Sequence, residues 1–205
     1  MCATDDPEPE QVLALARGGS ASALGQLLDL YRDYLALLAR LQIGRRLQRK
    51  VDASDLVQET FLQAHEHFAH FRGSTEGEWV SWLRQILAAT LANLVRHYCG
   101  TRRRDVRLER DLAAELDESS RAMDQSLVAK HSSPSQRAAR RELAVLLANA
   151  LARLPADYRE VIVLRHLEGL KFAEVAQQMG RTVDSVKKMW TPALARLRST
   201  LGGPS

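Results

Sequence analysis

The chain has 205 residues, of which 45% are hydrophobic but only 5% aromatic, and its formal net charge is +4. This length suits one ordinary domain or two small ones, and the composition favours helices packed through leucine, alanine and valine over a β-sandwich. No run approaches the ~20 apolar residues of a membrane helix. The acidic start MCATDDPEPEQ is unlike a secretory signal, and the two cysteines fit no zinc or disulfide spacing. We therefore expect a cytoplasmic all-α protein without membrane insertion.

The charges are segregated along the chain. Residues 1–16 have a net charge of −4 and residues 17–104 of +5, whereas residues 105–135 have −3 and residues 136–205 have +6. Two basic blocks separated by an acidic stretch indicate two modules that face one polyanion and are joined by a spacer. Ordinary solvated helix faces are the alternative.

The first block reads as helical. Residues 1–20 are expected to be an acidic N-terminal tail, and residues 21–104 to form the first module. Apolar residues three and four apart predict a helix over residues 21–41. A basic break then follows at residues 44–50.

Two further helices are expected in this module. Asp52 predicts an N-cap for a helix that ends near Gly73, followed by a polar loop over residues 71–79. A long helix is expected from about Glu78 to Arg103, burying Trp82. The inward side chains of the two helices are predicted to be Leu56, Phe61, Ala64, Phe68, Phe71, Trp82, Ile86, Leu87, Leu91 and Leu94.

The rest of the chain is predicted as a spacer and a second module. Residues 105–135 are rich in Asp, Glu and Ser and end in HSSPS, which is typical of a flexible linker with no more than transient helix. Residues 136–201 are expected to form the second module, with Pro155 at the first position of its second helix. The helices predicted there span residues 136–152, 155–168, 171–179 and 183–200.

The stretch AEVAQQMGRTVDSVKKMW (173–190) predicts a helix-turn-helix. Gly180 suits the left-handed end of one helix, and Thr182 suits the N-cap of the next. The second helix would leave a polar outer face near its N-terminus, which is how such motifs enter the major groove. A plain helical hairpin is the alternative. The helix is expected to bury Val183, Val186, Trp190, Leu194, Leu197 and Leu201.

The segment RLPADYREVIVLRHLEGLKFAEVAQQMGRTVDSVKKMW resembles region 4 of bacterial sigma factors, and DASDLVQETFLQAHEHFAHFRG resembles part of region 2. The chain is similar to the extracytoplasmic-function (ECF) sigma factors of the sigma-70 family, which keep only regions 2 and 4. The resemblance implies a transcription initiation factor that makes and breaks no covalent bond. It also implies three partners: core RNA polymerase through its β′ clamp helices and β flap, promoter DNA, and an anti-sigma factor or other regulator.

The resemblance implies three sets of site residues. Those matching the polymerase-docking surface are Asp55, Leu56, Gln58, Glu59 and Leu62. Those matching the part that melts and reads the minus-ten element are Arg72, Ser74, Trp79, Arg84, Asn93, Arg96, His97, Arg102, Arg103 and Arg104. Those matching the minus-thirty-five reader are Arg181, Thr182, Asp184, Ser185, Lys187, Lys188 and Thr191.

Two positions carry open alternatives. Trp79 could stack on unpaired bases or pack in the core, whereas the phase of Trp82 with Ile86 favours the core. Pro192 departs from the family pattern, because a proline inside a recognition helix removes a hydrogen bond and crowds the preceding turn. We expect one helix with a kink just before Pro192 rather than two helices.

No cofactor or metal site is predicted. The histidines of HEHFAH, His65, His67 and His70, lack the i, i+4 spacing of helical zinc sites, and no phosphate loop or nucleophile elbow is present. The functional alternatives are a one-component helix-turn-helix regulator that acts without polymerase and a hydrolase that uses these histidines.

Overall fold

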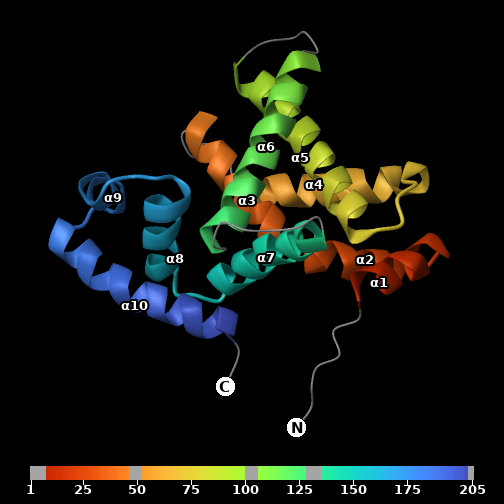
Figure 1. Ribbon diagram of the computed structural model, residues 1–205. Helices are drawn as coiled ribbons and strands as arrows, with labels where there is room; N and C mark the ends of the chain where they lie inside the picture. Colours follow the sequence, from red (N-terminus) through yellow and green to blue (C-terminus); the bar gives the residue numbers. More distant parts are fainter. Residues whose placement is uncertain (1–7, 47–51, 100–105, 128–134, 203–205) are drawn as a thin grey trace. The chain divides into compact units, whose positions relative to one another are not determined.

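The computed structural model describes residues 8–46, 52–99, 106–127 and 135–202, in which every regular element is a helix and no β-strand is present (Figure 1). The all-α class predicted from composition is confirmed. The chain divides into two compact units, residues 1–117 and 118–205. No helix in these described ranges is both long and apolar enough to cross a membrane.

The first unit begins with a helix, α1 (Pro9–Arg17), inside the segment that is predicted to be an acidic tail. Helix α1 packs against α2 (Ala21–Leu30), whose N-cap Ser20 accepts a hydrogen bond from the backbone N–H of Ala23. Val12, Leu13 and Ala16 are buried. Their spacing places them on one face of a helix, and this apolar face is why residues 9–17 fold despite their acidic neighbours.

Three longer helices form the body of this unit. They are α3 (Arg32–Arg46), α4 (Ala53–His67) and α5 (Glu76–Cys99), which pack on one another in every pairing. The single helix predicted over residues 21–41 is broken between α2 and α3 at Tyr31, whose N–H donates to Leu28 O at 3.1 Å. A short 3-10 segment, η1 (Phe68–His70), follows α4.

Residues 106–127, predicted to belong to a linker, form the helix α6 (Val106–Leu127). The acidic composition suggested a segment without stable helix, but the sequence also has an amphipathic pattern. Leu112 and Leu116 lie four residues apart on one helix face, and both are fully buried. Figure 1 shows α6 running beside α5.

The second unit contains α7 (Ser135–Ala152), α8 (Ala156–Ile162), the π-helical turn η2 (Val163–Leu167), α9 (Phe172–Met179) and α10 (Val183–Gly202). Pro155 is the N-cap of α8 rather than its first residue. The Arg159 guanidinium satisfies the open end of α7 by donating to Leu151 O, Ala152 O and Leu154 O at 2.8–3.2 Å. Helix α10 packs on α7, α8 and α9.

Candidate functional site

The outer face of α4 carries four of the five residues predicted to dock on polymerase. Asp52 caps the helix by accepting from Ser54 N–H at 2.9 Å. Four of the candidate side chains are exposed, and Leu62 keeps 60% of its surface accessible, which is unusual for a leucine. They are Asp55, Gln58, Glu59 and Leu62.

Leu56 does not belong to this surface. Its side chain is 2% exposed and lies on the core face of α4 with Val57, Thr60 and Ala64. The prediction groups Leu56 with the docking residues, but its side chain lies outside their exposed stripe, because one helical step from Asp55 turns it into the core. Phe61, predicted to point inward, is only half-buried, and the Arg32 guanidinium lies 4.8 Å from its ring centroid.

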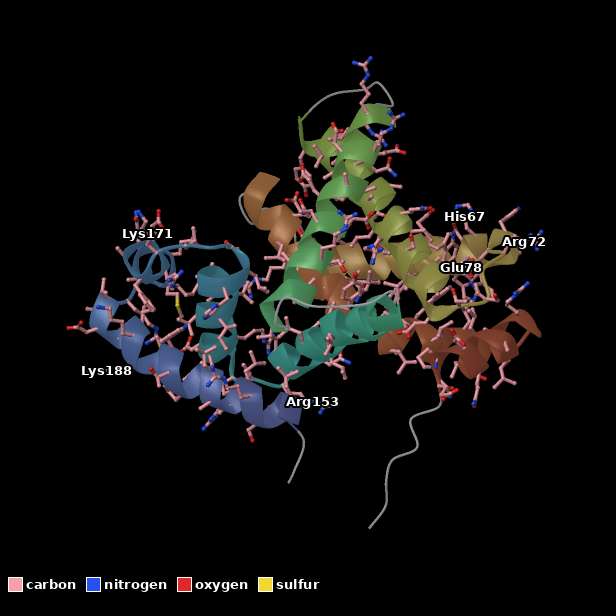
Figure 2. All side chains as sticks on the ribbon, viewed as in Figure 1. His67, Arg72, Glu78, Arg153, Lys171 and Lys188 are labelled. Atoms are coloured by element: carbon pink, nitrogen blue, oxygen red, sulfur yellow. The ribbon has the colours of Figure 1, made fainter. Side chains whose placement is uncertain are left out.

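The loop between α4 and α5 is fixed by a reciprocal cap. Glu78 Oε2 accepts from the backbone N–H groups of Ser74 and Thr75 at 2.9 and 3.1 Å, and Thr75 Oγ1 accepts from Glu78 N–H at 3.3 Å. The hydrogen bonds from Ser74 and then Thr75 lower the pKa of Glu78. Figure 2 shows Glu78 and the exposed Arg72 at this loop.

Gly73 occupies the tightest point of this loop. A β-carbon at position 73 would overlap the Phe71 ring and would lie 2.8 Å from Glu78 Cβ. Only a residue without a side chain therefore fits this backbone path. The exposed side chains of Arg72 and Ser74 flank it on either side in sequence.

The N-terminal helices hold the same loop from outside, a role that sequence reasoning missed. Arg17 Nη1 donates to Gly73 O at 3.1 Å, and Glu10 Oε1 accepts from Glu76 N–H at 3.4 Å. The buried Tyr31 donates its hydroxyl to Glu76 Oε1 at 2.8 Å. These contacts join residues more than forty positions apart, so no local pattern in the sequence could reveal them.

Trp79 packs in the core in this structure, which is one of the two alternatives left open for it. The side chain is 0% exposed, and its ring lies 5.5 Å from Phe71, 5.9 Å from Phe68 and 5.2 Å from Trp82, centroid to centroid. Trp82, predicted to be the core residue of the two, is half-buried. Trp79 and Trp82 lie three residues apart on one face of α5, so helical phase alone does not decide which ring is buried.

The basic residues predicted on α5 are mostly engaged within the protein. Arg84 Nε donates to Asp117 Oδ1 at 2.7 Å and its Nη1 to Tyr34 Oη at 3.0 Å. Burial acts to lower the pKa of Arg84, but Tyr34 and Asp117 outweigh it, so the pKa is raised and the charge is held. Arg84 is therefore not free to contact a phosphate in this structure.

The remaining predicted minus-ten residues fall into three groups. Arg96 Nη1 donates to Glu109 Oε1 at 3.3 Å, and its Nη2 donates to Asn93 Oδ1. Asn93 and His97 are exposed, and the His97 ring contacts Tyr98 edge-on. Arg102, Arg103 and Arg104 lie outside the described residues.

The second unit contains the predicted helix-turn-helix in α9 and α10. Gly180 adopts the left-handed conformation (φ 62°), with Gly180 N–H donating to Gln177 O and Arg181 N–H to Ala176 O at 3.3 and 2.9 Å. Thr182 Oγ1 then accepts from Ser185 N–H at 3.2 Å, as predicted for the cap of α10. Arg181 is held by Asp157 of α8 at 2.6 Å.

Helix α10 presents the predicted polar residues outward. Ser185 is half-buried, whereas its neighbours on this face are exposed and Lys188 projects from α10 in Figure 2. Val183 was predicted to be buried but is 36% exposed; the closest packing is made by Val186, Ala193 and Leu197. The exposed residues of the outer face are Arg181, Thr182, Asp184, Lys187, Lys188 and Thr191.

Trp190 connects the middle of α10 to the π-helical turn η2 by a hydrogen bond and ring contacts. Its indole Nε1–H donates to His166 Nε2 at 2.9 Å, the two rings stack with centroids 5.9 Å apart, and Phe172 meets Trp190 edge-on at 5.5 Å. This hydrogen bond requires His166 Nε2 to be unprotonated. Desolvation, and then the charge of Arg165, lower the pKa of His166 below its usual value.

The Trp190–His166 bond is expected to weaken in acid. Because the folded pKa of His166 is depressed, the unfolded chain binds the proton more strongly, and stability present above the usual pKa of about 6.5 is lost as the pH falls through the folded pKa. NMR of the Trp190 indole N–H should show its downfield shift collapsing over this range. His166→Gln, whose amide oxygen can still accept, should abolish the titration, whereas His65→Gln should leave it unchanged. A titration that survives His166→Gln would contradict the assignment.

The histidines of HEHFAH do not form a ligand set. His65, His67 and His70 are exposed, and the nearest described ring contact is His67 with His70 at 6.5 Å between centroids (Figure 2 shows His67 at the end of α4). Across the described part of the chain, no three His, Cys, Asp or Glu side chains are grouped to hold a metal ion.

Two family models match the chain in order. The model described as Sigma-70 region 2 matches residues 30–104, and the model described as Sigma-70, region 4 matches residues 144–197. The first match contains α3–α5, and the second begins in α7 and ends in α10. Together they span more than half of the chain.

Relatives match over most of the length. The ECF RNA polymerase sigma factor BldN of Streptomyces coelicolor is 28% identical over 202 residues, which span 97% of this chain and 67% of that protein. The ECF RNA polymerase sigma-E factor of Haemophilus influenzae is 27% identical over 169 residues, 82% of each chain. Among solved structures, CnrH in complex with the cytosolic domain of CnrY is 26% identical with a TM-score of 0.36, covering 96% of this chain and 99% of that one.

The matches to both regions do not favour a one-component regulator, since such a protein would have no use for region 2. The relatives are transcription factors rather than enzymes. The chain belongs to the extracytoplasmic-function group of the sigma-70 family, and it is a transcription initiation factor that binds core RNA polymerase and directs it to specific promoters.

Proposed function

We propose that this sigma factor docks on the β′ clamp helices of core RNA polymerase through the exposed face of α4. The observation that carries the proposal is the exposed stripe formed by Asp55, Gln58, Glu59 and Leu62 on a helix whose opposite face is buried. Residues spaced three and four apart lie together on a helix. An exposed leucine among acidic and amide groups is the mixture of an apolar anchor and a polar rim that protein interfaces use.

The loop over residues 71–75 is proposed to read the melted minus-ten element. Its backbone is fixed by Glu78, Thr75 and Arg17, while Arg72 and Ser74 remain exposed. A preorganised loop loses little conformational entropy when it captures an unpaired base. The half-buried Trp82 replaces Trp79 as the aromatic ring that borders this site.

Helix α10 is proposed to read the minus-thirty-five element in the major groove. We propose that Lys187 and Lys188 contact phosphates and that Asp184, Ser185 and Thr191 reach base edges. The salt bridge from Arg181 to Asp157 fixes the turn that precedes the helix. Region 4 is proposed to contact the β flap as well.

The setting and regulation of the protein follow from this role. A factor that binds core polymerase acts in the cytoplasm, and we propose that an anti-sigma factor controls it. The solved complexes of CnrH with CnrY and of RsbN with BldN show similar chains bound to another protein.

The α4 assignment predicts a defect confined to polymerase binding. Changing Asp55, Gln58 and Glu59 together to alanine should weaken core binding by about 1–3 kcal/mol, which is typical of losing several interface contacts. Far-UV circular dichroism should be unchanged because none of the three side chains is buried. Affinity can be measured by competition with labelled wild-type chain for core polymerase.

A matched control removes the same three residue types elsewhere. Glu8, Gln26 and Asp29 are exposed on or beside α1 and α2, so their joint replacement by alanine removes the same charge without touching α4. This control should bind core polymerase normally. If both triple variants lost the same amount of core affinity, net charge would explain the effect, and the assignment of α4 to the interface would be wrong.

A further inference from the structure

Two arginines of α5 that match the DNA-binding part of region 2 are occupied by carboxylates of α6. Asp117 Oδ1 accepts a hydrogen bond from Arg84 Nε at 2.7 Å, and Glu109 Oε1 accepts one from Arg96 Nη1 at 3.3 Å; both pairs are salt bridges. The arginine side chains are only 12% and 13% exposed. Because Glu109 precedes Asp117 whereas Arg96 follows Arg84, α6 runs antiparallel to α5 across these pairs, side by side with it in Figure 1.

These are contacts of a packed helix rather than chance meetings of surface side chains. Leu112 and Leu116 lie between Glu109 and Asp117 in sequence, and both are 0% exposed. Arg84 is also tied to the buried Tyr34 by its Nη1, so its guanidinium stays in place whichever anion its Nε contacts. Arg84 is thus held by two separate contacts, one to the buried Tyr34 and one to Asp117.

A carboxylate and a DNA phosphate bind an arginine in the same way, since each accepts charge-assisted hydrogen bonds from the guanidinium. One guanidinium edge cannot satisfy both at once. The acidic stretch that contains α6 has a net charge of −3 over residues 105–135, opposite to the +5 of the region 2 segment that it follows. Helix α6 thus presents to the arginines of α5 the same kind of anionic acceptor that DNA phosphates would present.

We infer that the Arg84–Arg96 surface of α5 is shared by two alternative occupants, the acidic face of α6 in the free chain and the phosphate backbone of promoter DNA in the polymerase-bound chain. This inference rests on the proposed function, because it takes the DNA whose minus-ten element is read at residues 71–75 to continue along α5, the helix that follows this loop. It adds that α6 leaves α5 before DNA is engaged. Free chain therefore binds DNA poorly even though its region 2 is basic.

The test weakens α6 without altering the arginines. Glu109→Gln and Asp117→Asn together keep the side-chain shapes but remove both charges facing α5. The free full-length chain carrying both changes should bind a fluorescent single-stranded oligonucleotide of mixed sequence about tenfold more tightly than wild type, the effect expected of releasing two partly buried ion pairs. The control is Asp111→Asn with Glu118→Gln, which removes the same charge from exposed positions of α6.

Equal gains in the two double variants would overturn the inference, because net charge alone would then explain them. In holoenzyme, where α6 is already displaced, Glu109→Gln/Asp117→Asn and wild type should bind the oligonucleotide equally well. A tenfold gain there too would mean that α6 still covers α5 on the polymerase, which also overturns the exchange. The free-chain comparison involves no polymerase, so failure of the α4 docking proposal would be seen separately as loss of effect in the core-binding assay.

Discussion

Replacing Trp79 with alanine is expected to destabilise the first unit strongly rather than to impair DNA binding alone. The fully buried ring contacts Phe68, Phe71 and Trp82, and truncating a core tryptophan costs about 3–5 kcal/mol through lost burial and the cavity left behind. A loss of this size is a large part of the stability of a small domain. Urea unfolding followed by far-UV circular dichroism should show the first unit of the variant unfolding at a much lower urea concentration than that of the wild type.

The control for this variant is Trp79→Phe. The indole Nε1 of Trp79 is buried without a hydrogen-bond partner in the described residues, so phenylalanine removes an unsatisfied donor while keeping an aromatic ring. Its cost should stay below about 1.5 kcal/mol. If Trp79→Ala kept wild-type stability but abolished promoter melting, the ring would be a DNA platform and the packing account would be wrong.

Replacing Pro192 should produce the largest gain in the stability of the second unit. Helix α10 runs without interruption from Val183 to Gly202 with Pro192 inside it, which confirms one helix rather than two; the bend just before Pro192 stays a prediction. Proline in a helix interior costs about 3 kcal/mol because it removes the bond to Lys188 O and crowds that carbonyl. Pro192→Ala should therefore stabilise the second unit by up to about 3 kcal/mol in urea unfolding.

Pro192→Arg separates the geometry of α10 from its charge. It should raise helicity as alanine does and, in addition, strengthen duplex DNA binding with a steeper dependence on salt, since one more phosphate contact becomes possible. Pro192→Ala is the matched control for the added charge. If neither variant gains helicity, the helix already accommodates the proline, and the recognition-helix geometry of the family would not apply here.

The parts of the fold that local chemistry determines could be predicted from the sequence. Gly180 and Thr182 act on their immediate neighbours, so the end of α9 and the start of α10 follow from residue type alone. The capping box of Thr75 and Glu78 is equally local. It explains why α5 begins at Glu76, two residues before the predicted start.

Parts that depend on distant partners could not be predicted. Trp79 and Trp82 share one face of α5, and only their packing against Phe68 and Phe71 decides which ring is buried. Arg84 is a plausible phosphate ligand until the fold brings Asp117 and Tyr34 to it. Helices α1 and α6 did carry an apolar pattern, but abundant carboxylates made composition favour a tail and a linker.

The close fit of Gly73 against Phe71 and Glu78 has a consequence for protein engineering. Position 73 admits no side chain, so the path of the loop is fixed while the exposed side chains of Arg72 and Ser74 on either side of it can vary. Under the proposed role of the loop, promoter preference becomes a modular property. It can be rewritten by exchanging residues 72 and 74 on an unchanged scaffold, and orthogonal sigma factors could be built from this chain without redesigning the backbone.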